Sequence, residues 1–192
     1  MNKRLCTMML VLIALLILMS VGLCFARTSH DGKQPMDKFL LQDSIVNGLE
    51  MMGYEATPER IALLLETAAA ETKCGHFEVP YKQRGSFGTF QITQSTAKDT
   101  LEWLRRSDWR LWQNLMENVF DPSESLVDNL IFNQEFSAAL AWLVYRRMGK
   151  NADISTRETR AALWKRVYNT PMGAGSEAGY LKAARECLDE IH

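Results

Sequence analysis

A glutamate near the end of a predicted helix, Glu71, is the residue of this sequence best placed for acid–base chemistry. Thr57 followed by Pro58 predicts the start of that helix, because Thr is a favourable N-cap and Pro is tolerated in the first turn. Glu71 lies seven residues beyond Leu64, within about 20° of that apolar side chain around the helix axis. Burial and the carbonyl oxygens of a helix C-terminus both disfavour a carboxylate. We therefore expect a raised pKa for Glu71, which suits a general acid near neutral pH.

The other glutamate in the second half of this helix, Glu66, points about 140° away from Glu71, and we expect it to face solvent. The spacing also fits a surface position for Glu71, if the helix ends earlier than predicted. Interpreting Glu71 as a catalytic group therefore depends on its neighbours from elsewhere in the chain.

A short glycine-flanked segment, residues 85–92, is the second candidate. Its alternation predicts a strand-like stretch in which Phe90 and Ile92 face the core, while Thr89 and Gln91 share the opposite side. The amide of Gln91 offers both donors and acceptors, which suits a sugar with hydroxyl and acetamide groups. An ordinary hairpin without a binding role is the alternative.

The third candidate is the run 164–175, where a predicted helix ends in a turn built of Asn, Pro and two Gly. Tyr168, at the end of that helix, is placed to direct its hydroxyl into a site. The alternative is a core tyrosine that precedes a loop.

Together the three segments resemble the lytic transglycosylase and goose-type lysozyme superfamily. That family shows a glutamate followed by Ser or Thr, then a Gly-x-x-Gln-Ile segment, then a late Tyr-Asn pair. Here the order is Glu71-Thr72, then Gly88-Thr89-Phe90-Gln91-Ile92, then Tyr168-Asn169, within residues 58–183. The Glu-Thr-x-x-Gly form at 71–75 and the run 164–175 also look like a phage-associated branch.

The resemblance implies a mainly α, lysozyme-like helical domain with a small β-like element and a cleft between two lobes. It implies that Glu71 is the single catalytic acid and base, and that no metal or cofactor is needed. The residues implied to bind substrate are Thr72, Gln91, Tyr168 and Asn169. Thr72 stands where Ser is usual, Thr89-Phe90 replaces Leu-Met, and Thr170 replaces Ala, which leaves the catalytic atoms in place.

The reaction implied is cleavage of the bond between N-acetylmuramic acid and N-acetylglucosamine in peptidoglycan. Glu71 protonates the glycosidic oxygen, the acetamide of the substrate stabilises the cation, and Glu71 then accepts the proton of the 6-hydroxyl as a 1,6-anhydro ring closes. Most glycosidases use a second carboxylate, but Glu78 and Asp99 occupy loop and helix positions without a motif match. The alternatives are a hydrolytic muramidase of the same fold, a non-catalytic wall-binding or scaffold protein, and a membrane-anchored adaptor.

The N-terminus predicts export. Lys3 and Arg4 precede an uncharged, apolar stretch over residues 7–25, which ends at Ala26 before a polar run. This pattern is typical of a signal peptide over 1–26, although the stretch is also long enough to act as an inner-membrane anchor. Residues 27–36 are expected to be a flexible lead-in and 37–192 the catalytic domain. We therefore expect a periplasmic location and peptidoglycan glycan strands as the partner. The biological context would be wall turnover, a wall-spanning secretion machine, or a phage lysis or entry system.

Composition limits the other functions. The chain has 192 residues, of which 47% are hydrophobic and 23% charged, as in globular proteins. A net charge of −1 without a basic stripe argues against a nucleic-acid partner. Beyond Cys6 and Cys24 in the signal, only Cys74 and Cys187 remain, and with three scattered histidines they make no metal site. In an oxidising compartment Cys74 and Cys187 either form a disulfide or stay as two thiols.

Further helices are predicted from capping residues and apolar spacing. Their expected starts are Thr93, Ser107, Asp121 with Pro122 and Glu124, Asn133 in a helix ending at Gly149, Ser155 with Glu158, and Ser176.

Overall fold

The computed structural model describes residues 37–73, 85–169 and 173–189. The expected signal or anchor at 1–26, the lead-in at 27–36 and Cys74 lie outside these ranges. The chain divides into two units, and all described residues belong to the second, Gln34–His192. None of the helices in the described ranges is both long and apolar enough to cross a membrane.

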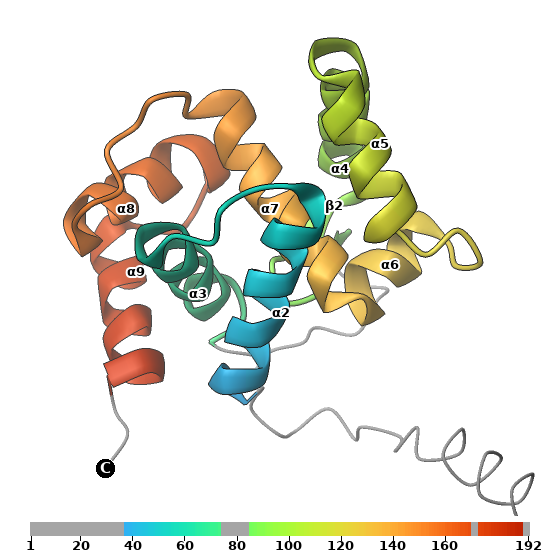
Figure 1. The fold of residues 1–192 in the computed structure, drawn as a ribbon. Coiled ribbons are helices and arrows are strands. Elements are labelled where there is room, and N and C mark those ends of the chain that lie inside the picture. Colours follow the sequence, from blue (N-terminus) through green and yellow to red (C-terminus); the bar gives the residue numbers. More distant parts are fainter. Residues whose placement is uncertain (1–36, 74–84, 170–172, 190–192) are drawn as a thin grey trace, which may run out of the picture. The chain divides into compact units, whose positions relative to one another are not determined.

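Helices dominate this unit, which confirms the expected mainly α fold (Figure 1). In chain order the elements are α2 (Lys38–Met52), α3 (Pro58–Thr72), β1 (Ser86–Phe87), β2 (Ile92–Thr93), α4 (Gln94–Ser107), α5 (Trp109–Asn118), α6 (Leu126–Phe132), α7 (Gln134–Met148), α8 (Arg157–Leu163), the π-helical turn η1 (Trp164–Tyr168), α9 (Glu177–Ala184) and the π-helical turn η2 (Arg185–Asp189). The two strands pair antiparallel, with Ser86 opposite Thr93 and Phe87 opposite Ile92. The expected β-like element is therefore a small hairpin rather than one continuous strand over 87–92.

The core is centred on α7. Between Phe136 and Tyr145 every residue of α7 except Trp142 is buried. Helix α2 packs closely against it, because a Cβ on Gly48 would lie 2.3 Å from the carbonyl oxygen of Glu135. Only glycine allows so close an approach of two backbones. In the view of Figure 1, α3, α8 and α9 lie on one side of α2 and α7, and α4, α5 and α6 lie on the other.

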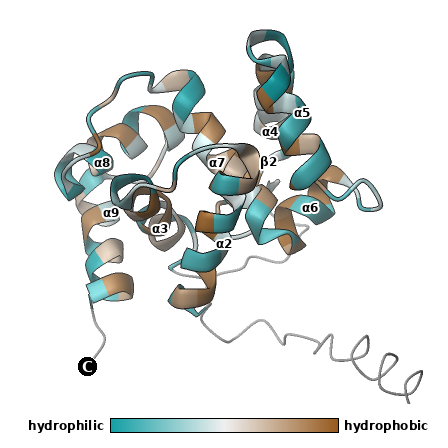
Figure 2. Cartoon of the chain, viewed as in Figure 1, coloured by the Kyte–Doolittle hydropathy of each residue, from teal (hydrophilic) through white to brown (hydrophobic). Residues whose placement is uncertain are grey.

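Helices α4 and α5 carry polar and apolar residues side by side, as Figure 2 shows. Helix α4 buries Ala97, Thr100 and Leu104, whereas α5 buries only Leu115. This pattern is typical of surface helices that pack one narrow face on the core.

Four of the predicted helix starts are confirmed. The Thr57 hydroxyl accepts a hydrogen bond from the backbone N–H of Arg60 at 3.4 Å, and Pro58 occupies the first turn. The side chains of Thr93, Asn133 and Ser176 cap α4, α7 and α9 in the same way. These caps satisfy N–H groups that have no partner inside the helix.

Three predicted starts are wrong, each by a few residues. Asp121 closes a turn by accepting from the N–H and hydroxyl of Ser123, and α6 begins later with Ser125 as its N-cap. A short polar side chain can close such a turn instead of starting a helix. Helix α5 starts from Asp108 rather than Ser107.

The start of α8 is also displaced. Thr156, not Ser155, is its N-cap, and Thr159 completes the capping box instead of Glu158. In this segment neighbouring residues share the same capping chemistry, so the sequence does not distinguish them.

Helix α3 is buried around most of its circumference, not on one face alone. Leu63, Leu64, Ala68 and Ala69 are fully buried, and Glu66 is only 1% exposed. The expectation that Glu66 faces solvent is therefore wrong, because α8 and α9 cover the side of α3 that the sequence pattern left open.

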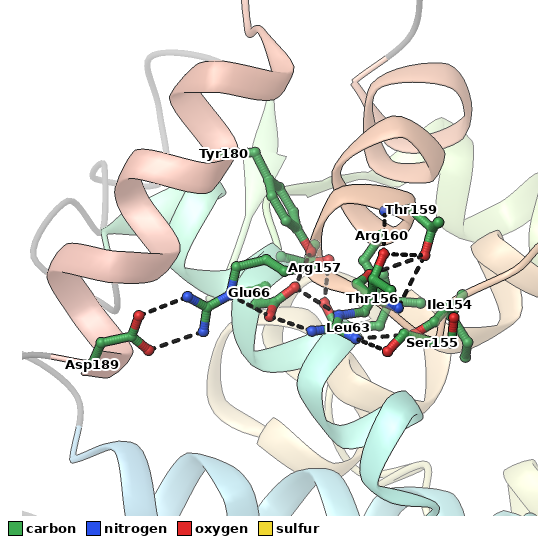
Figure 3. Close-up of polar contacts among 11 residues, drawn as sticks. Leu63, Glu66, Ile154, Ser155, Thr156, Arg157, Thr159, Arg160, Tyr180 and Asp189 are labelled. Carbon is green, nitrogen blue, oxygen red and sulfur yellow. Dashed lines mark hydrogen bonds and ion pairs between the residues drawn. The ribbon is translucent and has the colours of Figure 1, made fainter.

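The buried Glu66 carboxylate is surrounded by donors from two helices, α8 and α9 (Figure 3). Arg160 donates to both of its oxygens at 2.8 Å, Arg157 donates to Oε1 at 3.0 Å, and the Tyr180 hydroxyl donates to Oε2 at 3.1 Å. Arg157 also forms a two-pronged ion pair with Asp189 at 2.6 and 2.9 Å. A buried charge is tolerated when it is paired and fully hydrogen-bonded, so this Glu66 cluster holds α8, α9 and η2 to α3.

Replacing Glu66 with Gln should destabilise the fold by about 3–5 kcal/mol, because the Arg160 guanidinium then stays buried without a countercharge. Urea denaturation of purified protein measures the change. Glu50→Gln is the matched control, since Glu50 is exposed on α2 and its replacement should stay within about 0.5 kcal/mol. Equal stabilities of the two variants would contradict the anchoring role of the Glu66 cluster.

Candidate active site

Glu71 lies in the last turn of α3, so the predicted helix does extend to this residue. The carboxyl is half-buried, and the indole N–H of Trp164 donates to its Oε1 at 2.9 Å. Among the described residues, Trp164 is the only hydrogen-bond partner of this carboxyl. Glu71 thus differs from Glu66 on the same helix, because no cation neutralises it in the described part of the chain.

Burial raises the pKa of Glu71 to about 7. The hydrogen bond from Trp164 acts in the opposite direction, because it stabilises the charged form, but its effect is smaller than that of desolvation. Both protonation states are therefore populated near neutral pH. This is the property that a group needs if it must first donate and then accept a proton.

Trp164 begins the π-helical turn η1, in which the backbone N–H of Asn169 donates to the carbonyl of Trp164 at 2.9 Å. Such turns are frequent at functional sites. The Trp164 ring lies 5.3 Å from that of Tyr180, whose hydroxyl reaches Glu66. Glu66 and Glu71 are thus connected through two aromatic side chains.

Sequence reasoning did not assign Trp164 a role, although it lies inside the third candidate segment. A buried tryptophan usually finds an acceptor for its indole N–H, and this rule predicts that Trp164 bonds with some acceptor. It does not identify which of many acceptors is used, because Glu71 lies 93 residues away in the chain.

The turn after η1 supports Trp164. Lys165 donates to the side-chain oxygen of Asn169 at 3.0 Å and to the carbonyl of Gly173 at 2.8 Å. A Cβ on Gly175 would lie 2.5 Å from the Trp164 ring. Asn169 and Gly175 therefore have structural roles beside the indole, which explains why these residue types occur in the run 164–175.

The hairpin between β1 and β2 depends on two residues with left-handed backbone. Gly88 has a φ of 67°, and a Cβ there would lie 1.9 Å from the carbonyl oxygen of Leu130. Gln91 has a φ of 48°, and its side-chain amide donates to the carbonyl of Gly88 at 2.8 Å. One N–H of Gln91 thus closes the turn, and the half-buried side chain keeps further polar capacity for a ligand.

The expected orientation of the hairpin is right for three residues and wrong for one. Phe90 and Ile92 are buried in the core, and Gln91 is half-buried. Thr89 is fully buried and donates to the side-chain oxygen of Gln134 at 3.0 Å, so it does not share an open side with Gln91. A two-residue strand followed by a tight turn does not keep the period of two on which the expectation was based.

Thr72 is also fully buried. Its hydroxyl lies 2.9 Å from the carbonyl oxygen of Ala68 and 3.4 Å from that of Thr89. This position links the end of α3 to the hairpin and makes Thr72, next to Glu71 in the chain, a supporting residue that is closed to solvent.

Tyr168 joins η1 to the hairpin. Its hydroxyl donates to the carbonyl of Phe90 at 2.8 Å, and its ring stacks on Tyr145 at 5.2 Å. Burial raises the pKa of Tyr168 well above its ordinary value, and the negative charge of Glu71 adds to the shift. Tyr168 is therefore close enough to Glu71 to sense its charge.

Other candidates lie elsewhere. Asp99 is exposed on α4, Glu78 lies outside the described residues, and Cys187 is half-buried in η2, with its expected partner Cys74 outside the described ranges. Within those ranges, no group of three or more His, Cys, Asp or Glu side chains is arranged to hold a metal ion.

The structure thus brings Trp164 to Glu71 at the C-terminal end of α3, and it joins the hairpin that contains Gln91 to α3 through Thr72 and to η1 through Tyr168. Asn169 supports the segment after η1. Comparisons of the chain with protein families, with curated proteins and with solved structures found no match.

Proposed function

We propose that this chain is a peptidoglycan lytic transglycosylase of lysozyme-like fold in which Glu71 is the catalytic acid and base. The observation that carries the proposal is the state of Glu71: half-buried, bonded to Trp164, unpaired with any described cation, and with a pKa of about 7. The order of sequence motifs that resembles the lytic transglycosylase superfamily supplies the substrate class.

In the proposed reaction the protonated Glu71 donates its proton to the glycosidic oxygen, and the bond to N-acetylglucosamine breaks. The acetamide of N-acetylmuramic acid stabilises the cation, and the Glu71 carboxylate then takes the proton of the 6-hydroxyl as the anhydro ring forms. Trp164 fixes Oε1, which leaves Oε2 for the substrate. Gln91 and Tyr168 line the approach from the hairpin and η1.

The engagement of Glu66 supports a mechanism with one carboxylate. Two arginines and a tyrosine bind both of its oxygens, so it is not available as a nucleophile or base. A muramidase with two carboxylates would need a second, available carboxylate close to the first, and the engagement of Glu66 excludes the carboxylate that lies nearest to Glu71 along α3.

We further propose that the protein is exported and acts in the periplasm on glycan strands, with residues 1–26 as signal or anchor. The charged start, the apolar stretch and Ala26 carry this part of the proposal.

Replacing Glu71 with Gln should lower activity by about 10²–10⁴-fold, because the amide keeps the shape but cannot give and take the proton. Release of fragments from purified peptidoglycan measures the rate, and circular dichroism confirms that the fold is kept. Mass spectrometry should find products with a 1,6-anhydro ring, lighter by one water than hydrolytic products.

Glu78→Gln and Asp99→Asn are the controls for this experiment, and both should retain most of the activity. Hydrated, reducing products together with loss of activity in either control would establish a two-carboxylate muramidase instead. An inactive wild-type protein that still binds purified walls would indicate a wall-binding protein.

Replacing Trp164 with Phe should raise the pKa of Glu71 above about 7. The indole N–H stabilises the carboxylate, so its loss favours the protonated form. A hydrogen bond to a charged group contributes about 1.5–3 kcal/mol, which corresponds to about 1–2 pH units. The high-pH limb of the activity profile, where the general acid loses its proton, should move upward accordingly.

The pKa of Glu71 is measured directly from the carbon-13 shift of its carboxyl during a pH titration. Trp109→Phe is the matched control, because Trp109 is exposed on α5 and its loss should leave the pKa unchanged. An unchanged or lower pKa in Trp164→Phe would refute the role assigned to the indole.

A further inference from the structure

A cavity among the described residues has Arg60, at the opposite end of α3 from Glu71, in its lining. Arg60 is in the first turn of α3 and Glu71 in its last, eleven residues later, which separates them by about 16 Å along the helix axis. The cavity has a volume of about 390 Å³ and is lined by the α2–α3 loop, the C-terminal half of α7 and the segment that leads into α8. This volume is within the range of small-molecule sites.

Three cations from three parts of the chain line this cavity: Arg60, Arg146 and Lys150. No acidic side chain is among the described residues that line it. Two acidic groups act on these cations. The Asp108 carboxylate lies 3.6 Å from Nη2 of Arg146, a long ion pair between half-exposed groups, and the exposed Glu59 interacts with the charge of its neighbour Arg60. Such exposed pairs contribute little, so the lining of the cavity keeps a net positive charge.

Aromatic rings hold the two arginines in place. The Arg60 guanidinium lies 5.6 Å from the Tyr54 ring and 5.1 Å from the Trp142 ring, and that of Arg146 lies 5.2 Å from Tyr54. Cation–π contacts fix the planes of the guanidinium groups without using their N–H donors. Both arginines are therefore held in place. Arg60 also donates from Nη1 to the carbonyl of Glu55, and Arg146 hydrogen-bonds with the Tyr54 side chain, so part of their donor capacity is left for a ligand.

Two hydrogen-bond donors of residues that line the cavity, Nε1 of Trp142 and Nη1 of Arg146, have no acceptor among the described residues. These residues are four apart on α7, so they lie on one face of the helix. Both atoms are covered by neighbouring groups, but the Arg146 side chain is 35% exposed and can turn toward a ligand. A buried donor without a partner is costly, and an oxygen acceptor in the cavity would relieve that cost.

We propose that this cavity is a binding site for an oxyanion, a carboxylate or phosphate group carried by a small molecule or by a segment of the cell wall. The anion contacts Arg146, Arg60 and Lys150, and the apolar or sugar part of the ligand lies on the rings of Tyr54 and Trp142. Arginine is well suited to this task because its planar fork matches two oxygens of one group. The site is separate from Glu71 and does not depend on the reaction proposed there.

Indole N–H resonances in nitrogen-15 NMR spectra test the proposal, because Trp142 reports the cavity and Trp164 reports the Glu71 site. Spectra of Trp142→Phe and Trp164→Phe assign the two signals. The protein is titrated separately with inorganic phosphate, acetate and muramyl dipeptide. We expect a saturable shift of the Trp142 signal that weakens as salt is added.

Arg146→Gln should weaken the binding by about tenfold or more, since a hydrogen-bonded charge is lost. Arg147→Gln is the matched control, because Arg147 is the exposed neighbour on α7 that does not line the cavity, and binding should stay within about twofold. Lys150→Gln, in an exposed position that folding does not require, should also weaken it. Glu71→Gln should leave it unchanged.

Tighter binding of muramyl dipeptide than of acetate would assign the anion to a wall carboxylate, and saturation by phosphate alone would assign it to free phosphate. The proposal is overturned if no probe gives a saturable shift of Trp142. It is equally overturned if Arg146→Gln and Lys150→Gln bind with wild-type affinity.

Discussion

The burial of two carboxyl groups on one helix is the constraint on which the rest of this structure depends. Glu66 and Glu71 are five residues apart on α3, and the protein treats them in opposite ways. Glu66 receives two guanidinium groups and a hydroxyl, which make it a fixed anchor for α8, α9 and η2. Glu71 receives one indole N–H and no described cation, so burial raises its pKa to about 7. Glu66 also supports the surroundings of Glu71, because Tyr180 touches both Glu66 and the ring of Trp164.

Features set by neighbouring residues could be predicted from the sequence. The caps at Thr57, Asn133 and Ser176 follow from local chemistry, as does the extension of α3 to Glu71. The raised pKa of Glu71 was expected from its helix face, and desolvation is indeed its largest cause. The caps predicted at Ser107 and Ser155 were wrong by one residue, because each lies beside another capping residue and packing rather than propensity decides between the two.

Features that depend on distant contacts could not be predicted. Glu66 was expected in solvent because helical periodicity shows only one apolar face, whereas the partners that bury the other face are 91 to 114 residues away. Alternation placed Thr89 on the open side with Gln91, and the motif implied that Thr72 binds substrate, but both hydroxyls bond inside the protein. The role of Trp164 needed the knowledge that η1 returns to the end of α3. In each case the residue type indicates which hydrogen bonds a side chain can make, but not which distant residue it bonds with.

The long separations also fix the order in which the site can form. Trp164 is 93 residues from Glu71, Arg160 is 94 from Glu66, and Tyr168 is 78 from Phe90. Contacts of this kind close late in folding, because the loop entropy must be overcome first. A chain that has emerged only as far as residue 156 already contains Glu71, but its carboxyl is still hydrated and has an ordinary acidity. The raised pKa of Glu71 therefore arises only when the segment that carries Trp164 docks, so we expect a nascent chain, or one truncated before this segment, to keep an ordinary carboxyl at this position.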